Sequence, residues 1–140
     1  MSSAPAFLLD TNVLSETRKK APDPGPISFL KSIDSASLFL SVLTVGELRK
    51  GVAAKMRTDP VAAKRFLAWV EGIVVGFTGH ILDVDAATAR LWGEWSGDRP
   101  RPVVDTLLAA TAVVHGLTLV TRNTRDFTGI PVKLHNPWTE

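Results

Sequence analysis

The chain has 140 residues, the size of one ordinary domain, and 45% of them are hydrophobic, as in globular proteins. It contains no cysteine, which excludes disulfide scaffolds, cysteine-ligated zinc, iron–sulfur clusters and thiol catalysis. Sixteen Lys and Arg against fourteen Asp and Glu give a net charge of +2, too small by itself to drive nucleic-acid binding.

The first half of the chain alternates short apolar runs with helical patterns. Residues Ala6–Leu9 form a continuous apolar run typical of a buried strand. The polar residues Asp10-Thr11-Asn12 follow it, and they favour a turn and the start of a helix that reaches about Thr17. The next expected elements are a loop over Ala21–Pro26, a helix over Ile27–Ile33, a strand over Ser37–Ser41 and a helix from Thr44 to about Met56.

The second half continues the alternation. Asp59-Pro60 is a cap followed by proline at the first helical position, which predicts a helix there. Gly116 is expected to end a long apolar helix as its C-cap. The other expected elements are a strand over His80–Val84, a helix capped by Asp85, a loop over Gly97–Pro102, the apolar helix over Val103–His115, and strands over Leu117–Thr121 and Val132–Leu134.

Strands that alternate with helices predict an α/β fold in which a central parallel sheet of four to five strands is flanked by helices. We expect a single domain over residues 1–140. The longest apolar-rich run, Leu107–Val114, is too short to span a bilayer, and the start of the chain has no basic segment typical of a signal peptide. A cytoplasmic protein without membrane association is therefore the expectation.

Acidic and amide side chains follow the predicted strands where these end. Asp10 follows the first strand, Glu47 comes one helical turn after the second, and Asn123 and Asp126 follow the fourth. Asp105 lies near the start of the apolar helix. Ligands of open parallel sheets bind outside the carboxyl ends of the strands, so these residues are expected to converge on one edge.

Convergent carboxylates repel one another unless a divalent cation neutralises them. Oxygen ligands select hard cations such as Mg²⁺ or Mn²⁺. Such a site can activate water and stabilise the leaving oxygen of a phosphodiester. Arg122 and Arg125 lie beside the fourth strand, where they can meet phosphate oxygens.

Each acid also has a purely structural interpretation. Thr44 and Glu47 fit a capping box, in which Glu47 would bind the backbone of Thr44. Asp105 lies in a first helical turn, where the helix dipole favours an acid. Asp10 can cap the helix that follows it, and Asp126 can be a turn residue.

Four stretches of the chain resemble the PIN-domain ribonucleases, and in particular VapC-type toxins of bacterial toxin–antitoxin pairs. In chain order they are Phe7–Glu16, Leu40–Gly51, Val104–Ala112 and Leu119–Phe127, followed by the ending Asn136-Pro137-Trp138. Together they cover nearly the whole chain in the family's order. The full pattern is most similar to the FitB-like subgroup.

The resemblance implies a site and a cofactor. Asp10, Glu47 and Asp105 would be metal-coordinating acids that hold one or two Mg²⁺ or Mn²⁺ ions, which activate a water against an RNA phosphodiester. Thr11 and Thr44 would be polar helpers. Many relatives have Asp where this chain has Asn123, so the fourth position is open. We expect Asn123 to touch the site, with Asp126 in support.

The resemblance also implies partners. VapC-type toxins are usually held inactive by a small cognate antitoxin of the VapB type, often through a basic residue among the acids. Many relatives form homodimers, and a homodimer within a toxin–antitoxin complex is expected here. Trp92 and Trp95 have helical spacing that is typical of core residues.

Three other functions compete with this one. A phosphatase of the haloacid-dehalogenase type needs Asp-x-Asp, and the third residue here is Asn12. A receiver domain needs an acidic pair near its first strand and a lysine after its last, and neither is present. A catalytically weak or inactive module that binds RNA or antitoxin is favoured by Asn123, whereas the intact Asp10, Glu47 and Asp105 oppose it.

Overall fold

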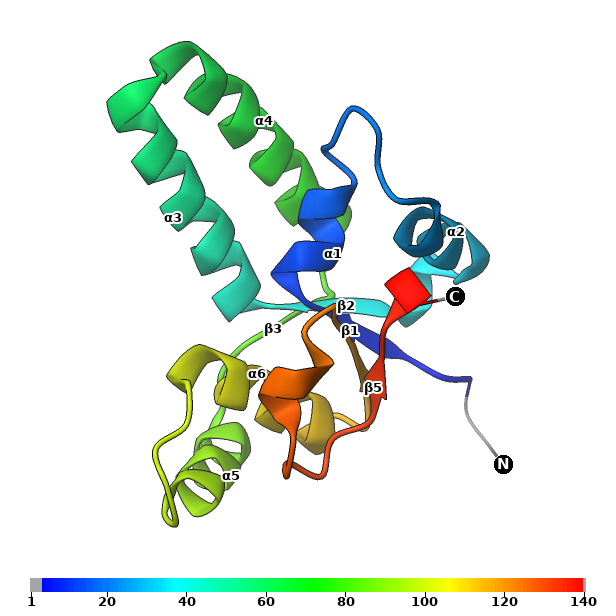
Figure 1. The fold of residues 1–140 in the computed structure, drawn as a ribbon, viewed down its shortest axis with the longest axis vertical. Helices are drawn as coiled ribbons and strands as arrows, with labels where there is room; N and C mark the ends of the chain where they lie inside the picture. Colours follow the sequence, from blue (N-terminus) through cyan, green and yellow to red (C-terminus); the bar gives the residue numbers. More distant parts are fainter. Residues whose placement is uncertain (1–3, 140) are drawn as a thin grey trace.

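The computed structural model describes residues 4–139. Its centre is a five-stranded parallel sheet in the order β3-β2-β1-β4-β5 (Figure 1). The strands are β1 (Phe7–Leu9), β2 (Leu38–Ser41), β3 (Ile81–Leu82), β4 (Thr118–Val120) and β5 (Leu134–His135). The predicted α/β fold with a parallel sheet of four to five strands is thus confirmed. The strand order reverses at β1, so the carboxyl ends of β1 and β4 border the crevice where such sheets bind ligands.

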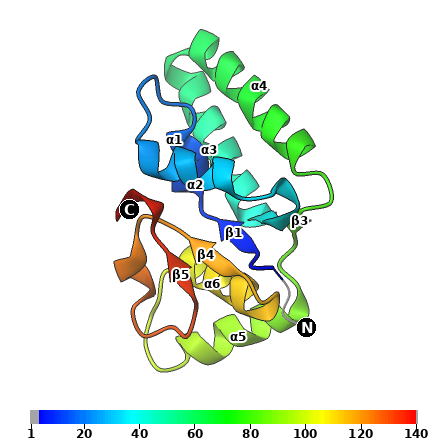
Figure 2. The same ribbon diagram turned by 90° about the vertical axis from the view of Figure 1, so that its right-hand side faces the viewer.

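Helices cover both faces of this sheet. They are α1 (Thr11–Glu16), α2 (Pro24–Ser32), α3 (Val42–Thr58), α4 (Pro60–Gly76), α5 (Ala86–Ser96) and α6 (Val103–Val114), with 3₁₀ turns η1 (Ser35–Ser37), η2 (Thr124–Phe127) and η3 (Pro137–Thr139). Helices α1 to α4 lie on one side of the sheet and α5 and α6 on the other (Figure 2). The pair α3 and α4 forms a hairpin that extends beyond the sheet. Within residues 4–139, no helix is both long and apolar enough to cross a membrane.

Two apolar clusters hold these layers together, because neighbouring residues of a strand point to opposite faces. Leu9 and Val120 belong to the cluster under α1 to α4, while Leu8 and Leu119 belong to the cluster against α6. All four side chains are fully buried. Trp95 of α5 packs on the second cluster while remaining half-buried. The adjacent strand residues therefore fix the sheet between two cores, which gives its carboxyl edge a rigid support.

The predicted helix caps are confirmed where a short polar side chain precedes the helix. Asp59 accepts a hydrogen bond from the Ala62 amide, and Asp85 accepts one from the Thr88 amide. Gly116 follows α6 with a φ of 67°, a conformation that glycine adopts without strain.

Some boundaries differ from the predictions. Helix α2 begins at Pro24, inside the segment predicted as a loop, because Asp23 caps it and proline is well tolerated in a first turn. Helix α3 begins at Val42 rather than Thr44, since the Ser41 side chain accepts a hydrogen bond from the Leu43 amide. Strand β3 is shorter than expected and strand β5 begins later than expected, and both lie at the edges of the sheet.

Candidate functional site at the carboxyl edge of the sheet

Asp10 occupies the middle of the candidate site, directly after β1. Its side chain is only 8% exposed, and its Oδ1 accepts a hydrogen bond of 2.7 Å from the Thr11 amide, which makes it the cap of α1. Its second oxygen, Oδ2, accepts a hydrogen bond of 2.8 Å from Thr121 Oγ1. Burial raises the pKa of Asp10, although these two hydrogen bonds oppose the rise. Asp10 therefore caps a helix and also faces the site with a carboxylate that is costly to ionise.

Thr121 is a site residue that the sequence did not single out. It follows β4 directly and is fully buried. While its hydroxyl donates to Asp10, it accepts hydrogen bonds from the Asn123 amide at 3.1 Å and from Asn12 Nδ2 at 3.5 Å. A threonine after a strand has many structural uses, so only its contact with Asp10 identifies this one as the group that holds the carboxylate in place.

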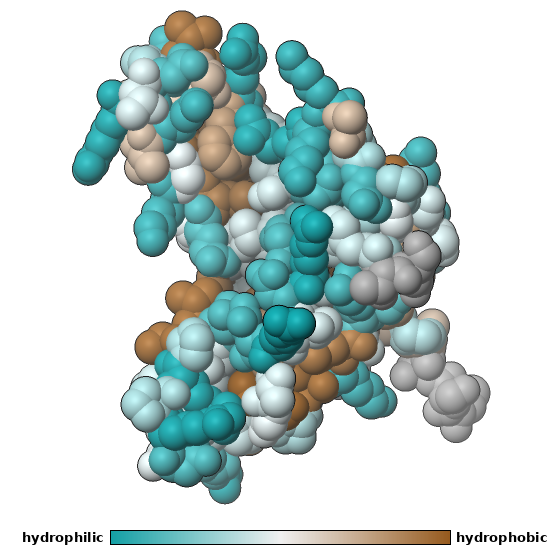
Figure 3. Space-filling model, in the orientation of Figure 1, coloured by the Kyte–Doolittle hydropathy of each residue, from teal (hydrophilic) through white to brown (hydrophobic). Residues whose placement is uncertain are grey.

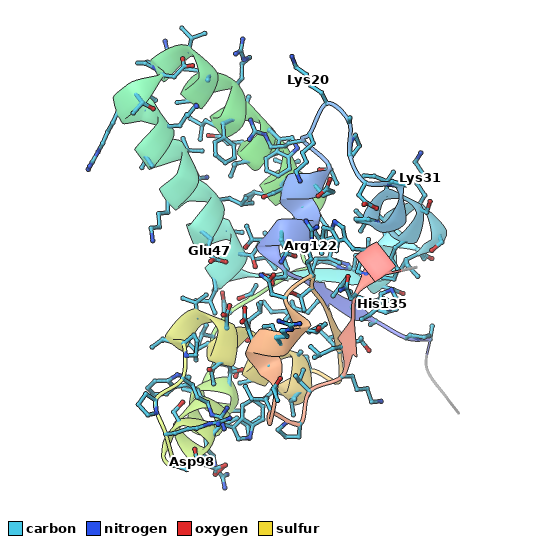
Figure 4. The ribbon with its side chains drawn as sticks, viewed as in Figure 1. Lys20, Lys31, Glu47, Asp98, Arg122 and His135 are labelled. Carbon is cyan, nitrogen blue, oxygen red and sulfur yellow. The ribbon has the colours of Figure 1, made fainter. Side chains whose placement is uncertain are left out.

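Glu47 reaches the site from the first turns of α3. Its Oε1 accepts a hydrogen bond of 2.7 Å from Thr11 Oγ1, which ties α3 to the start of α1. The capping-box interpretation of Glu47 is wrong, because Ser41 caps α3 and Thr44 lies inside the helix. Figure 4 places Glu47 at the end of α3 that lies against the sheet. Glu47 is an exposed side chain facing the other acids.

Asp105 comes from the opposite layer, in the first turn of α6. Within residues 4–139 its carboxylate accepts no hydrogen bond, and α6 has no side-chain cap. Burial raises the pKa of Asp105, and the charges of Asp10, Asp126 and Glu47 raise it further. A bound cation would offset both effects, because it neutralises the neighbouring charges.

Of the two candidates after β4, Asp126 takes part in the charge cluster. Its charge raises the pKa of both Asp10 and Asp105. The Asn123 side chain makes no hydrogen bond within the described part of the chain. The backbone N–H of Asn123 donates a hydrogen bond to Thr121 Oγ1. The carboxylates of Asp10, Glu47, Asp105 and Asp126 are therefore the four groups that repel one another here.

The donor set suits a hard divalent cation, since it consists of carboxylate oxygens with a hydroxyl beside them. Thr44 Oγ1, one turn before Glu47, is buried and has no hydrogen-bond partner among residues 4–139. In the same range, no three Asp, Glu or His side chains are close enough together to hold one ion as they stand. Glu47 is held by Thr11 instead, and its exposure leaves its side chain free to adjust.

Basic and apolar surfaces border the acids. Arg122 lies at the centre of the face in Figure 4, between Glu47 and His135, and with Arg125 it lines a polar pocket of about 370 Å³. On the other side of Glu47, an apolar groove of about 640 Å³ runs between the starts of α3 and α6, lined in part by Leu43 and Val104. Figure 3 shows apolar side chains gathered there beside a hydrophilic centre.

The arrangement has a counterpart among known proteins. Residues 7–133 match the PIN domain family, which covers most of the chain. The chain belongs to the PIN-domain family. This agrees with the resemblance seen in the sequence, and it rules out the haloacid-dehalogenase and receiver interpretations, whose folds are different.

Similar PIN-domain proteins include named toxins and ribonucleases. The chain is 33% identical to Toxin FitB of Neisseria gonorrhoeae, over 94% of this chain and 98% of FitB. It is equally identical to VapC ribonuclease Y4jK of Sinorhizobium fredii, over 94% of this chain and 97% of that protein. The crystal structure of FitAcB from N. gonorrhoeae superposes with a TM-score of 0.86 at 32% identity, covering 96% of this chain and 99% of the other. These matches span the whole candidate site.

Proposed function

We propose that this PIN domain is a metal-dependent endoribonuclease that acts as the toxin of a toxin–antitoxin pair. The observation that carries the proposal is the placement of Asp10, Glu47 and Asp105 at one edge of the sheet, where burial and the charges of neighbouring acids raise the pKa of the two aspartates. One relative that matches nearly the full chain is named a VapC ribonuclease, and another, from Shigella flexneri, which matches 86% of this chain, is named a tRNA(fMet)-specific endonuclease.

In this proposal Asp10, Glu47 and Asp105 hold the cation. Bound there, Mg²⁺ or Mn²⁺ would neutralise the carboxylates, activate a water and stabilise the leaving oxygen of the phosphodiester. Thr121 keeps the Asp10 carboxylate oriented, and Thr11 does the same for Glu47 through its hydroxyl. Thr44 brings an unpaired buried hydroxyl next to this set.

We assign the fourth acidic position to Asp126 in place of Asn123, which reverses the order of preference expected from the sequence. The charge of Asp126 acts on both Asp10 and Asp105, whereas the Asn123 side chain adds none. With Asp126 the cluster has four carboxylates, so the substitution of Asn at position 123 does not argue for an inactive module.

The substrate is RNA and the partner is a cognate antitoxin. Arg122 and Arg125 lie beside the acids and supply guanidinium groups for backbone phosphates. Single-stranded loops are the accessible target, because their phosphates and bases are not confined to a helix. Structures similar to this one are titled as complexes of FitAB and VapBC, including a DNA-bound VapBC from Salmonella typhimurium with a TM-score of 0.75 at 27% identity.

The apolar groove between α3 and α6 fits the antitoxin part of the proposal. Val104 is 37% exposed there, and Glu47 also lines the groove. An antitoxin segment that covers the groove could place a basic residue among the acids, where it would replace the cation. A homodimer within such a complex stays a prediction.

The test is cleavage of single-stranded and structured RNA by the purified chain. We expect cleavage with Mg²⁺ or Mn²⁺, and its loss with EDTA or with Asp10→Asn. Asp98→Asn is the matched control, because Asp98 is 71% exposed and lies at the far end of the molecule in Figure 4. Cleavage that survives both EDTA and Asp10→Asn would contradict the metal–acid mechanism.

A further inference from the structure

The C-terminal turn is fastened to the segment that follows β4. The Thr121 amide donates a hydrogen bond of 3.0 Å to the His135 carbonyl, which continues the pairing of β4 with β5. Asn136 Nδ2 then donates to the Arg122 carbonyl at 3.4 Å, and Asn136 Oδ1 accepts from the Trp138 amide at 2.9 Å. The backbone of Arg122 is thereby held next to Trp138, although the two residues are far apart in the chain.

This turn also has a rigid support beneath it. A Cβ on Gly25, in the first turn of α2, would collide with the Pro137 carbonyl oxygen, so α2 and the turn approach as closely as glycine allows. Helix α2 and η3 pack against each other. Trp138 is half-buried and packs on the core cluster that contains Phe29. The indole therefore has a fixed position from which to act on its neighbours.

The Arg122 guanidinium lies over the Trp138 indole, with its central carbon 5.4 Å from the ring centroid. A planar guanidinium stacks on an aromatic face and keeps its N–H groups available at its edge. Within residues 4–139, neither Arg122 nor Arg125 has a carboxylate within 4.0 Å, although Asp126 lines the same pocket. Two guanidinium groups without an ion-pair partner among the described residues, in a polar pocket, are suited to an anion.

The pocket begins one residue away from the catalytic edge. Thr121 turns its side chain inward to Asp10, and Arg122 is the next residue. Asp126 lines the same pocket and its charge acts on both Asp10 and Asp105, so the pocket adjoins the acids. A strand of RNA with one phosphate at the acids would therefore carry a neighbouring phosphate to this pocket.

We propose that the pocket lined by Arg122, Arg125 and Asn136 holds a backbone phosphate of the RNA beside the one that is cleaved, and that Trp138 is the positioning residue that fixes Arg122 for this contact. This inference rests on the proposed ribonuclease function and adds a subsite to it. The polyanionic strand is the favoured occupant, because phosphate contacts by arginine supply much of the affinity for nucleic acids.

The experiment measures KM, kcat and the salt dependence of binding for the full chain with an RNA that it cleaves. Binding is measured in the Asp10→Asn background, so that the RNA stays intact. We expect Arg122→Gln to raise KM several-fold with little change in kcat, and to reduce the slope of log K against log salt by about 1. Trp138→Leu should raise KM in the same way, whereas Trp138→Phe, which keeps an aromatic face, should restore it. Arg90→Gln is the matched control, since Arg90 is 80% exposed and lies on α5.

A second arm locates the phosphate. A series of RNAs carries one uncharged methylphosphonate linkage, each at a different position. At one position beside the cleaved bond, this linkage should weaken RNA binding by the wild type but should not further weaken RNA binding by Arg122→Gln. Inorganic phosphate should compete poorly, because it lacks the rest of the strand. If Arg122→Gln cleaves RNA with unchanged KM and salt slope, this proposal alone is overturned. The same holds if Arg122→Gln weakens the binding of an acidic peptide but not that of RNA. A chain that neither binds nor cleaves RNA would overturn the proposed function and this inference together.

Discussion

The hydrogen bond between Thr121 and Asp10 gives the sharpest prediction about how the site is built. Thr121→Val keeps the shape of the side chain and removes its hydroxyl, which donates to Asp10 Oδ2 at 2.8 Å in a fully buried position. A hydrogen bond to a charged group contributes about 1.5–3 kcal/mol to stability. In a domain of this size we expect the melting temperature to fall by about 5–10 °C.

The assay is thermal unfolding in metal-free buffer at neutral pH, with Thr44→Val as the matched control. Thr44 is equally buried, but its hydroxyl has no hydrogen-bond partner among the described residues. Replacing it with valine removes an unsatisfied polar group and should leave stability unchanged or raise it. Because Thr121 orients a proposed ligand, Thr121→Val should also lower activity or metal affinity by about 10–100-fold. Equal melting temperatures for the two variants would refute the role assigned to the Thr121 hydroxyl.

Three further predictions concern Asp10, the fourth acid and the C-terminal turn. Because burial raises the pKa of Asp10, its ionisation opposes folding: in EDTA, Asp10→Asn should match the wild type in melting temperature below the ordinary pKa of 3.8, and exceed it by a margin that grows as the pH rises through the raised pKa and is constant above it. A wild-type protein that is the more stable one at neutral pH without metal would contradict this. Asp126→Asn should weaken Mn²⁺ binding about tenfold by calorimetry, and Asn123→Ala by less than about twofold, and the reverse order would assign the fourth position to Asn123. Gly25→Ala places a Cβ against the Pro137 carbonyl and should cost about 1–3 kcal/mol in denaturant unfolding, a loss that would not occur if the turn were loosely held.

The parts of the fold that were predictable from sequence are those with local causes. The apolar run before Asp10, the Asp59 and Asp85 caps and the glycine at position 116 each depend on residues next to one another in the chain. The start of α3 predicted at Thr44 is two residues late, because Ser41 and Thr44 are both acceptable caps. Only the observed hydrogen bond from the Leu43 amide to Ser41 distinguishes them.

The same distinction applies to the site. Asp10, Glu47 and Asp105 could be named because parallel strands deliver their following residues to one edge. Thr121 could not, since its role depends on a contact with Asp10 across 111 positions of sequence. The contribution of Asp126 was equally beyond the sequence, because it depends on the short η2 turn bringing that carboxylate close enough for its charge to act on Asp10 and Asp105.

The central claim is that this chain cleaves RNA only when Asp10, Glu47 and Asp105 hold a divalent cation, and a Mn²⁺ titration of the single-turnover cleavage rate tests it most directly. The proposal predicts that the wild-type rate rises from zero to saturation with Mn²⁺, and that Asp10→Asn stays flat at the level of the metal-free reaction. A wild-type rate that is independent of Mn²⁺, or an Asp10→Asn variant that follows the same curve, would contradict it.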